Sequence, residues 1–128
     1  MRLLLDTHVA LWAVVDSPML SALARELILT PANEVFISAA TIWEISIKFA
    51  LGRGSMPISG AKAADCFARA GYFRLPMTWE HALAVESLPL HHADPFDRML
   101  VAQSLREPMR LLTHDRIVAK YADTIILV

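Results

Sequence analysis

The chain has 128 residues, the length of one domain with a single hydrophobic core. Hydrophobic residues make up 55% of it, yet no apolar run approaches the roughly 20 residues of a membrane-spanning helix. Twelve Lys and Arg against thirteen Asp and Glu give a net charge of −1, which does not indicate a basic nucleic-acid-binding protein. Composition therefore excludes a membrane protein and leaves the partner open.

The start of the chain and its cysteine content bear on where the protein acts. The apolar residues at positions 3–5 are followed at once by Asp6, too early for a secretion signal. The single cysteine, Cys66, cannot form a disulfide within the chain. We expect one domain over residues 1–128, located in the cytoplasm and without a membrane partner.

Short apolar runs alternate with helical patterns along the chain. The apolar runs predict buried strands over 2–6, 35–38, 73–76, 109–113 and 124–128. Caps and apolar spacing predict helices over 9–15, 17–29, 38–52, 61–70, 79–88, 94–108 and 116–121, with a flexible break at 52–57. This alternation predicts an α/β fold in which helices cover both faces of a parallel sheet of four to five short strands.

The segment 91–103 carries the clearest helix start. Asp94 is suited to cap the helix, Pro95 to occupy its first position and Asp97 to lie in its first turn. Both carboxylates could act only as capping groups, because acids are favoured at the positive end of the helix dipole. A catalytic role for Asp97 therefore requires other carboxylates to reach the same place.

Four carboxylates are predicted to converge. Asp6 and Asp115 follow two of the strands, and ligands bind parallel sheets beyond the carboxyl ends of their strands. Glu44 and Asp97 lie in the opening turns of helices. Glu44 could instead form a surface pair with Lys48, four residues on, but the apolar residues around it favour a cleft.

Converging carboxylates repel one another and destabilise the empty site unless a cation is bound. A set of oxygen ligands without thiolates favours Mg²⁺ or Mn²⁺ over Zn²⁺. Such an ion keeps positions open for water and phosphate oxygens, so the set predicts hydrolysis of a phosphodiester bond. Thr7, Ser38 and Thr113, each beside a strand end, could hold the metal's water or a phosphate, or could be ordinary helix caps.

Four ordered motifs, at Leu4–His8, Ile37–Ile45, Asp94–Arg98 and Leu111–Asp115, closely resemble the PIN-domain toxins of the VapC type. The resemblance implies a PIN fold and a Mg²⁺- or Mn²⁺-dependent endoribonuclease with an RNA substrate. It also implies a homodimer, neutralisation by a cognate antitoxin and assembly into a larger toxin–antitoxin complex. The family's acids fall on Asp6, Glu44, Asp97 and Asp115, which leaves Asp94 as a cap or a supporting residue.

The basic and histidine residues near these motifs are open to two interpretations. Lys48, Arg98 and Arg116 could contact RNA phosphates, although ordinary helix-surface charges would follow the same pattern. We assign His91 and His92 to a solvated loop rather than to a metal or RNA site.

Three alternatives fit part of the sequence. A receiver-type signalling domain also binds Mg²⁺ at strand ends, but only one acid ends the first strand and no lysine followed by proline follows the penultimate one. A phosphatase of the haloacid dehalogenase type would need two aspartates at the first strand end. A catalytically silent PIN-fold binding module would keep the fold and lose the reaction.

Overall fold

Five short parallel strands form one sheet in the computed structural model, which describes residues 1–52 and 56–128. The sheet order is β3-β2-β1-β4-β5, so β1 lies at the centre. Three residues of the predicted break, 53–55, lie outside the described part. The strands are β1 (Arg2–Leu5), β2 (Glu34–Ser38), β3 (Phe73–Leu75), β4 (Arg110–Thr113) and β5 (Ile126–Leu127). The predicted parallel sheet is confirmed.

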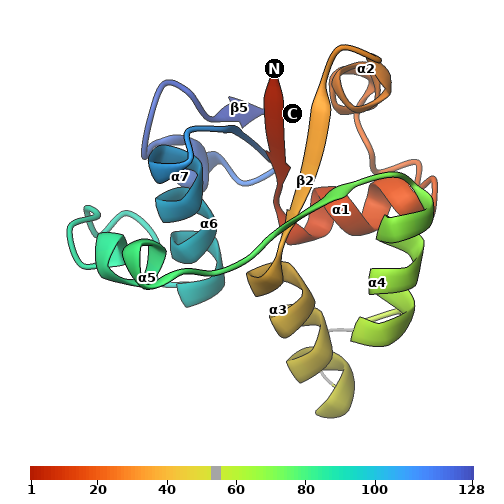
Figure 1. Cartoon of the computed structure of the whole chain (residues 1–128), viewed down its shortest axis with the longest axis horizontal. Coiled ribbons are helices and arrows are strands. Elements are labelled where there is room, and N and C mark those ends of the chain that lie inside the picture. Colours follow the sequence, from red (N-terminus) through yellow and green to blue (C-terminus); the bar gives the residue numbers. More distant parts are fainter. Residues whose placement is uncertain (53–55) are drawn as a thin grey trace.

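Helices cover both faces of this sheet (Figure 1). No helix in the described ranges is both long and apolar enough to cross a membrane. The helices are α1 (Thr7–Val14), α2 (Ala22–Leu29), α3 (Ala39–Ala50), α4 (Gly60–Arg69), α5 (Trp79–Val85), α6 (Pro95–Arg106) and α7 (Arg116–Ala119).

Side chains along β1 point alternately to the two faces of the sheet, and this divides the hydrophobic core into two parts. Leu3 and Leu5 pack with residues of α1, α2, α3 and α4, whereas Leu4 packs with residues of α6 and α7. Successive side chains of a strand point to opposite faces, and all three leucines are fully buried. The continuous apolar run of β1 is therefore the consequence of a strand covered on both faces.

Two helices begin at residues other than those predicted. Helix α1 begins at Thr7 rather than near residue 9, because the Asp6 side chain caps it directly after the strand. Helix α2 begins at Ala22 rather than after Ser17, because Ser21 accepts a hydrogen bond from a backbone N–H of its first turn. The Ser17 hydroxyl instead accepts from the backbone of a separate turn. The sequence offers two caps four residues apart, and the second one starts the helix.

A buried polar chain fixes α5 and α6 against the end of β2. The Ser38 hydroxyl donates to Gln103 Oε1 at 2.6 Å, and the Gln103 amide lies 3.4 Å from His81 Nδ1. His81 Nε2 lies 2.5 Å from Glu107 Oε2. Because Nδ1 also accepts from the Thr78 N–H, the imidazole proton is assigned to Nε2 and donated to Glu107. His81 is thus the residue by which the short helix α5 is anchored.

The order of the strands determines where the candidate site lies. Strands β2, β1 and β4 are neighbours and parallel, so their carboxyl ends meet at one edge of the sheet. Asp6 and Ser38 occupy that edge together with Thr113, and all three side chains are buried. The starts of α1, α3 and α7 follow directly, which brings their caps to the same place.

Candidate active site

Asp6 lies at the centre of this edge and is only 5% exposed. Its Oδ1 accepts from Val9 N at 2.9 Å, while Oδ2 accepts from the Thr113 hydroxyl at 2.7 Å and from His114 N at 3.4 Å. Burial raises the pKa of Asp6, although the hydrogen bonds from Thr113 and Val9 oppose the rise. The carboxylate is therefore held in one orientation by groups from two neighbouring strand ends.

Asp97 lies in the first turn of α6 and is partly buried. Burial, followed by repulsion from Asp94 and Asp6, raises its pKa to about 7, and Glu44 adds to the rise. His92 acts in the opposite direction. Burial is the largest cause of this rise, and the repulsion from Asp94, Asp6 and Glu44 indicates that these carboxylates lie on the same side of the molecule as Asp97.

Asp115 caps α7 and faces Asp97 across a histidine ring. Its Oδ1 accepts from Ile117 N at 2.7 Å, and its Oδ2 lies 2.9 Å from His92 Nε2. Burial alone would raise the pKa of Asp115, but the hydrogen bonds from Ile117 and His92 lower it. Asp115 is therefore an ionised carboxylate beside the carboxyl group of Asp97, whose pKa is raised.

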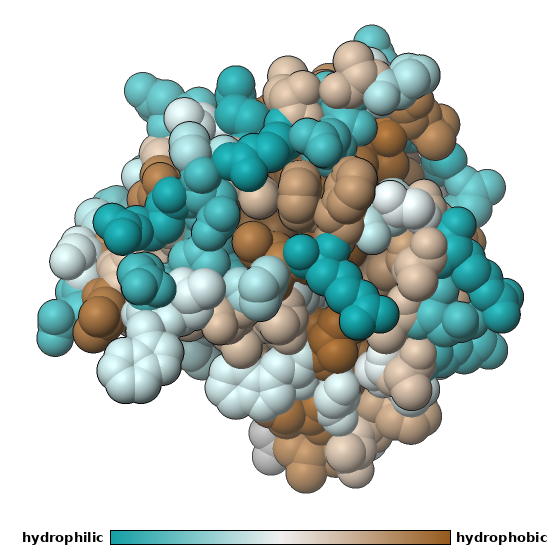
Figure 2. Space-filling model, in the orientation of Figure 1, coloured by the Kyte–Doolittle hydropathy of each residue, from teal (hydrophilic) through white to brown (hydrophobic). Residues whose placement is uncertain are grey.

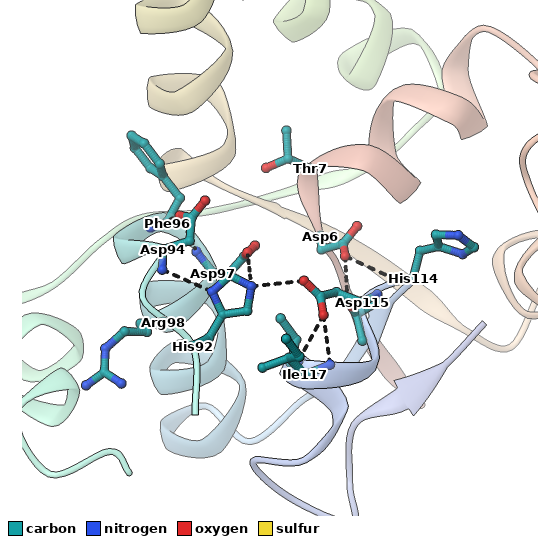
Figure 3. A network of polar contacts seen from close by, with 12 residues as sticks. Asp6, Thr7, His92, Asp94, Phe96, Asp97, Arg98, His114, Asp115 and Ile117 are labelled. Atoms are coloured by element: carbon teal, nitrogen blue, oxygen red, sulfur yellow. Dashed lines mark hydrogen bonds and ion pairs between the residues drawn. The ribbon is translucent and has the colours of Figure 1, made fainter. Parts of the chain in front are cut away.

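His92 is a member of the site that the sequence did not reveal. Its Nε2 lies 2.9 Å from Asp115 Oδ2 and 3.5 Å from Asp97 Oδ2, and its Nδ1 accepts from Asp94 N at 3.0 Å (Figure 3). The ligand atoms of His92, Asp97 and Asp115 lie within 4.8 Å of one another. Its assignment to a solvated loop is wrong, whereas His91 is exposed and packs against the Tyr121 ring.

Glu44 is buried and is also paired with Lys48, so it combines the two positions considered for it from the sequence. It is 4% exposed, and its Oε1 accepts from the Thr7 hydroxyl at 2.7 Å. Its Oε2 lies 2.5 Å from Lys48 Nζ, which is the predicted pair along the helix. The hydrogen bond to Glu44 raises the pKa of Lys48. Both Glu44 oxygens have partners, and neither Glu44 nor Asp6 belongs to the group of ligand atoms within 4.8 Å.

The other predicted residues divide into those that hold the acids and those that face elsewhere. Thr7 and Thr113 donate to Glu44 and Asp6, and Asp94 caps α6. Ser38 caps α3 and donates into the buried chain through Gln103, so it does not contact the acids.

The three basic residues considered for RNA binding have different surroundings in the structure. The Arg98 guanidinium points away from the acids and donates to the carbonyls of Val85 and Pro89 and to the Tyr121 hydroxyl (Figure 3). Of the two interpretations of Arg98, these bonds favour a structural role, because they hold the loop before α6. Arg116 is exposed in the first turn of α7, and Lys48 stays beside Glu44.

The ligand atoms that the site offers can be compared with those that divalent metal ions prefer. Asp97 and Asp115 offer carboxylate oxygens and His92 an imidazole nitrogen within 4.8 Å of one another, and Asp6 offers a further buried carboxylate at the same edge of the sheet. The raised pKa values of Asp6 and Asp97 show that their ionised forms are disfavoured without a compensating positive charge. Ions such as Mg²⁺ and Mn²⁺ prefer carboxylate oxygens, so the residues present fit such an ion.

The family model of the PIN domain matches residues 3–124, which span all four acids. The chain belongs to the PIN domain family. No curated protein matched the sequence. The PIN fold predicted from the sequence motifs is therefore confirmed by an independent comparison.

Solved structures show the same fold at low sequence identity. The structure of VapBC2 from Rickettsia felis bound to a DNA fragment from their promoter matches with a TM-score of 0.69 and 15% identity, over 98% of this chain and 96% of the other. FitAcB from Neisseria gonorrhoeae matches with a TM-score of 0.64 and 18% identity, over 98% of this chain and 96% of the other. VapBC-1 from nontypeable Haemophilus influenzae matches with a TM-score of 0.60 and 16% identity, over 98% of this chain and 95% of the other. This PIN domain thus has the arrangement of these proteins along nearly its whole length.

Proposed function

We propose that this PIN domain is a Mg²⁺- or Mn²⁺-dependent endoribonuclease that acts in the cytoplasm as the toxin of a type II toxin–antitoxin pair. The observation that carries the proposal is the cluster of His92, Asp97 and Asp115, whose ligand atoms lie within 4.8 Å of one another beside the buried Asp6, with the pKa of Asp97 raised to about 7. Membership of the PIN domain family and the four motifs of the VapC type support the same function.

In this proposal Asp6, Asp97 and Asp115 hold the metal, and His92 supplies a ring nitrogen beside Asp97 and Asp115. The bound ion would lower the pKa of a water molecule and neutralise negative charge on the phosphodiester. The Thr113 hydroxyl orients Asp6 by its hydrogen bond to Oδ2. Lys48 adds a positive charge at the same edge, where it can attract the RNA backbone.

Glu44 has a separate part in the proposed reaction. The Thr7 hydroxyl and the Lys48 ammonium fix both of its oxygens, so its carboxylate is oriented before any substrate binds. Its charge lies close enough to contribute to the raised pKa of Asp97. We therefore assign Glu44 to the acidic site as a carboxylate that supports the metal ligands through their shared electrostatics.

The antitoxin is proposed to bind an apolar groove beside the edge strand β3. The groove has a volume of about 460 Å³, and its lining comes from β2, β3, α3 and α4, including Ile42, Phe67 and Tyr72. Apolar side chains also reach the surface over the C-terminal end of α3, at the bottom of the view in Figure 2. Exposed apolar area of this kind is typical of protein interfaces, which also supports the homodimer and a larger toxin–antitoxin assembly.

The proposed function predicts cleavage of RNA that depends on both the metal and the acids. Purified protein incubated with total cellular RNA and Mg²⁺ or Mn²⁺ should produce discrete fragments, and EDTA should abolish them. Asp6→Asn should remain folded and lose the activity, whereas Asp65→Asn, which removes an exposed acid on α4, should keep it. Fragments of equal yield from the wild type and Asp6→Asn would contradict the proposal. A receiver domain would instead be labelled by a small phosphodonor.

A further inference from the structure

An aromatic pair lies beside the acids and is not used by the proposed reaction. Trp43 precedes Glu44 on α3, and Phe96 precedes Asp97 on α6. Their ring centroids are 5.1 Å apart, with an angle of 75° between the ring planes. The two helices that carry Glu44 and Asp97 are thus joined by these aromatic rings.

Trp43 is not part of the hydrophobic core. It is 53% exposed, whereas Glu44, the next residue, is 4% exposed. Successive residues of a helix point in directions about 100° apart, which accounts for this difference. The contact with Phe96 nevertheless fixes the indole in place, because edge-to-face packing favours one relative orientation of the two rings.

The charges near this pair suit a nucleic-acid strand. Lys48 lies one turn beyond Glu44 on α3, pairs with that carboxylate and keeps a third of its side chain exposed. Figure 3 shows the Phe96 ring pointing away from the acids and toward α3, while Asp97 points into the site. Lys48 therefore supplies a positive charge beside Glu44, and Trp43 supplies an open aromatic ring one residue before Glu44 on the same helix. Single-stranded nucleic acids bind by such a combination of charge and aromatic surface.

We propose that Trp43, held in place by Phe96, stacks on an unpaired base of the RNA next to the cleaved phosphate. The inference rests on the proposed function and assigns to Trp43 the positioning of the base next to the cleaved phosphate. A base within a duplex has no free face for the indole, so a paired segment cannot use this contact.

The test measures RNA binding separately from cleavage. In the Asp97→Asn background with Mg²⁺ present, fluorescence anisotropy gives the Kd for a labelled oligouridylate of 12 nucleotides. Trp43→Ala should weaken binding about 10-fold or more, because stacking on one aromatic residue has about this effect. Trp43→Phe keeps a flat ring and should stay within about 3-fold of the parent.

Trp79→Ala is the matched control, because Trp79 is a tryptophan that is 85% exposed at the start of α5. It should leave the Kd for the oligouridylate unchanged. A fully paired RNA of the same length should bind the parent and Trp43→Ala equally.

Three results would overturn the inference, and they are distinguishable. Equal binding of the oligouridylate by the parent and Trp43→Ala would overturn stacking alone, and the proposed function would stand. If Trp43→Ala and Trp43→Phe weaken RNA binding equally and both change the oligomeric state in gel filtration, Trp43 belongs to a protein interface instead. Failure of both the parent and the wild type to bind RNA would overturn the proposed function together with this inference.

Discussion

Replacing Asp97 with Asn is expected to lower RNA cleavage about 100- to 1,000-fold while the protein stays folded. The substitution keeps the shape of the side chain and removes the negative charge that the metal needs. The backbone N–H of Asp97 would still donate to Asp94, so the first turn of α6 should be preserved. Initial rates of fragment formation from a defined RNA, with circular dichroism to check the fold, measure the effect.

Asp94→Asn is the matched control for this experiment, because it removes a charge three residues away and keeps a good N-cap. Its cleavage rate should stay within about 10-fold of the wild type, since capping accounts for its contacts. If Asp94→Asn were the inactive variant and Asp97→Asn the active one, the assignment of the metal ligand to Asp97 would be wrong.

The metal-free protein is expected to lose stability as the pH rises from about 4 to about 7. The pKa of Asp97 is raised from 3.8 to about 7, so the folded protein binds a proton in this range that the unfolded chain has released. Since one pKa unit corresponds to about 1.4 kcal/mol, the free energy of unfolding should fall by about 2–4 kcal/mol. Urea unfolding in EDTA at several pH values measures this change.

The same variant and the metal itself provide controls for the pH effect. Asp97→Asn carries no charge to release, so its stability should depend less on pH and should exceed that of the wild type above pH 7. Mg²⁺ should raise the melting temperature of the wild type at pH 8, because an ion that binds only the folded state stabilises it. A wild-type profile that is flat or rises between pH 4 and 7, with Asp97→Asn following it, would contradict crowding of the acids.

Local signals in the sequence were sufficient for most of the fold. The apolar runs of β1 and β4 predict buried strands because parallel strands are covered on both faces. Asp94 and Pro95 predict the start of α6, which the structure has at Pro95. Four carboxylates at strand ends and helix starts predict one acidic edge, because parallel strands bring their carboxyl ends together.

The features that the sequence did not reveal depend on contacts between distant residues. His92 meets Asp115, 23 residues later, and nothing in the spacing of the two indicates this contact. The sequence did carry a weak local signal, since His92 lies two residues before the cap Asp94 and accepts from its N–H.

The directions of other side chains also could not be predicted from their positions in the sequence. Arg98 was open to an RNA contact or a surface position, and its guanidinium reaches back to carbonyls of the 85–89 segment. In α5 the apolar Leu83 is 67% exposed, whereas the polar His81 is buried and anchors the helix. In both cases a partner supplied by another part of the fold decides where the side chain points.

The central claim is that Asp6, Asp97 and Asp115 share one divalent metal ion. Anomalous diffraction from a crystal soaked in Mn²⁺ tests it directly. The account predicts an anomalous peak among these three carboxylates, and its absence from a crystal of Asp97→Asn soaked in the same way. A Mn²⁺ peak bound elsewhere on the chain, with the three carboxylates free of metal at saturating Mn²⁺, would contradict it.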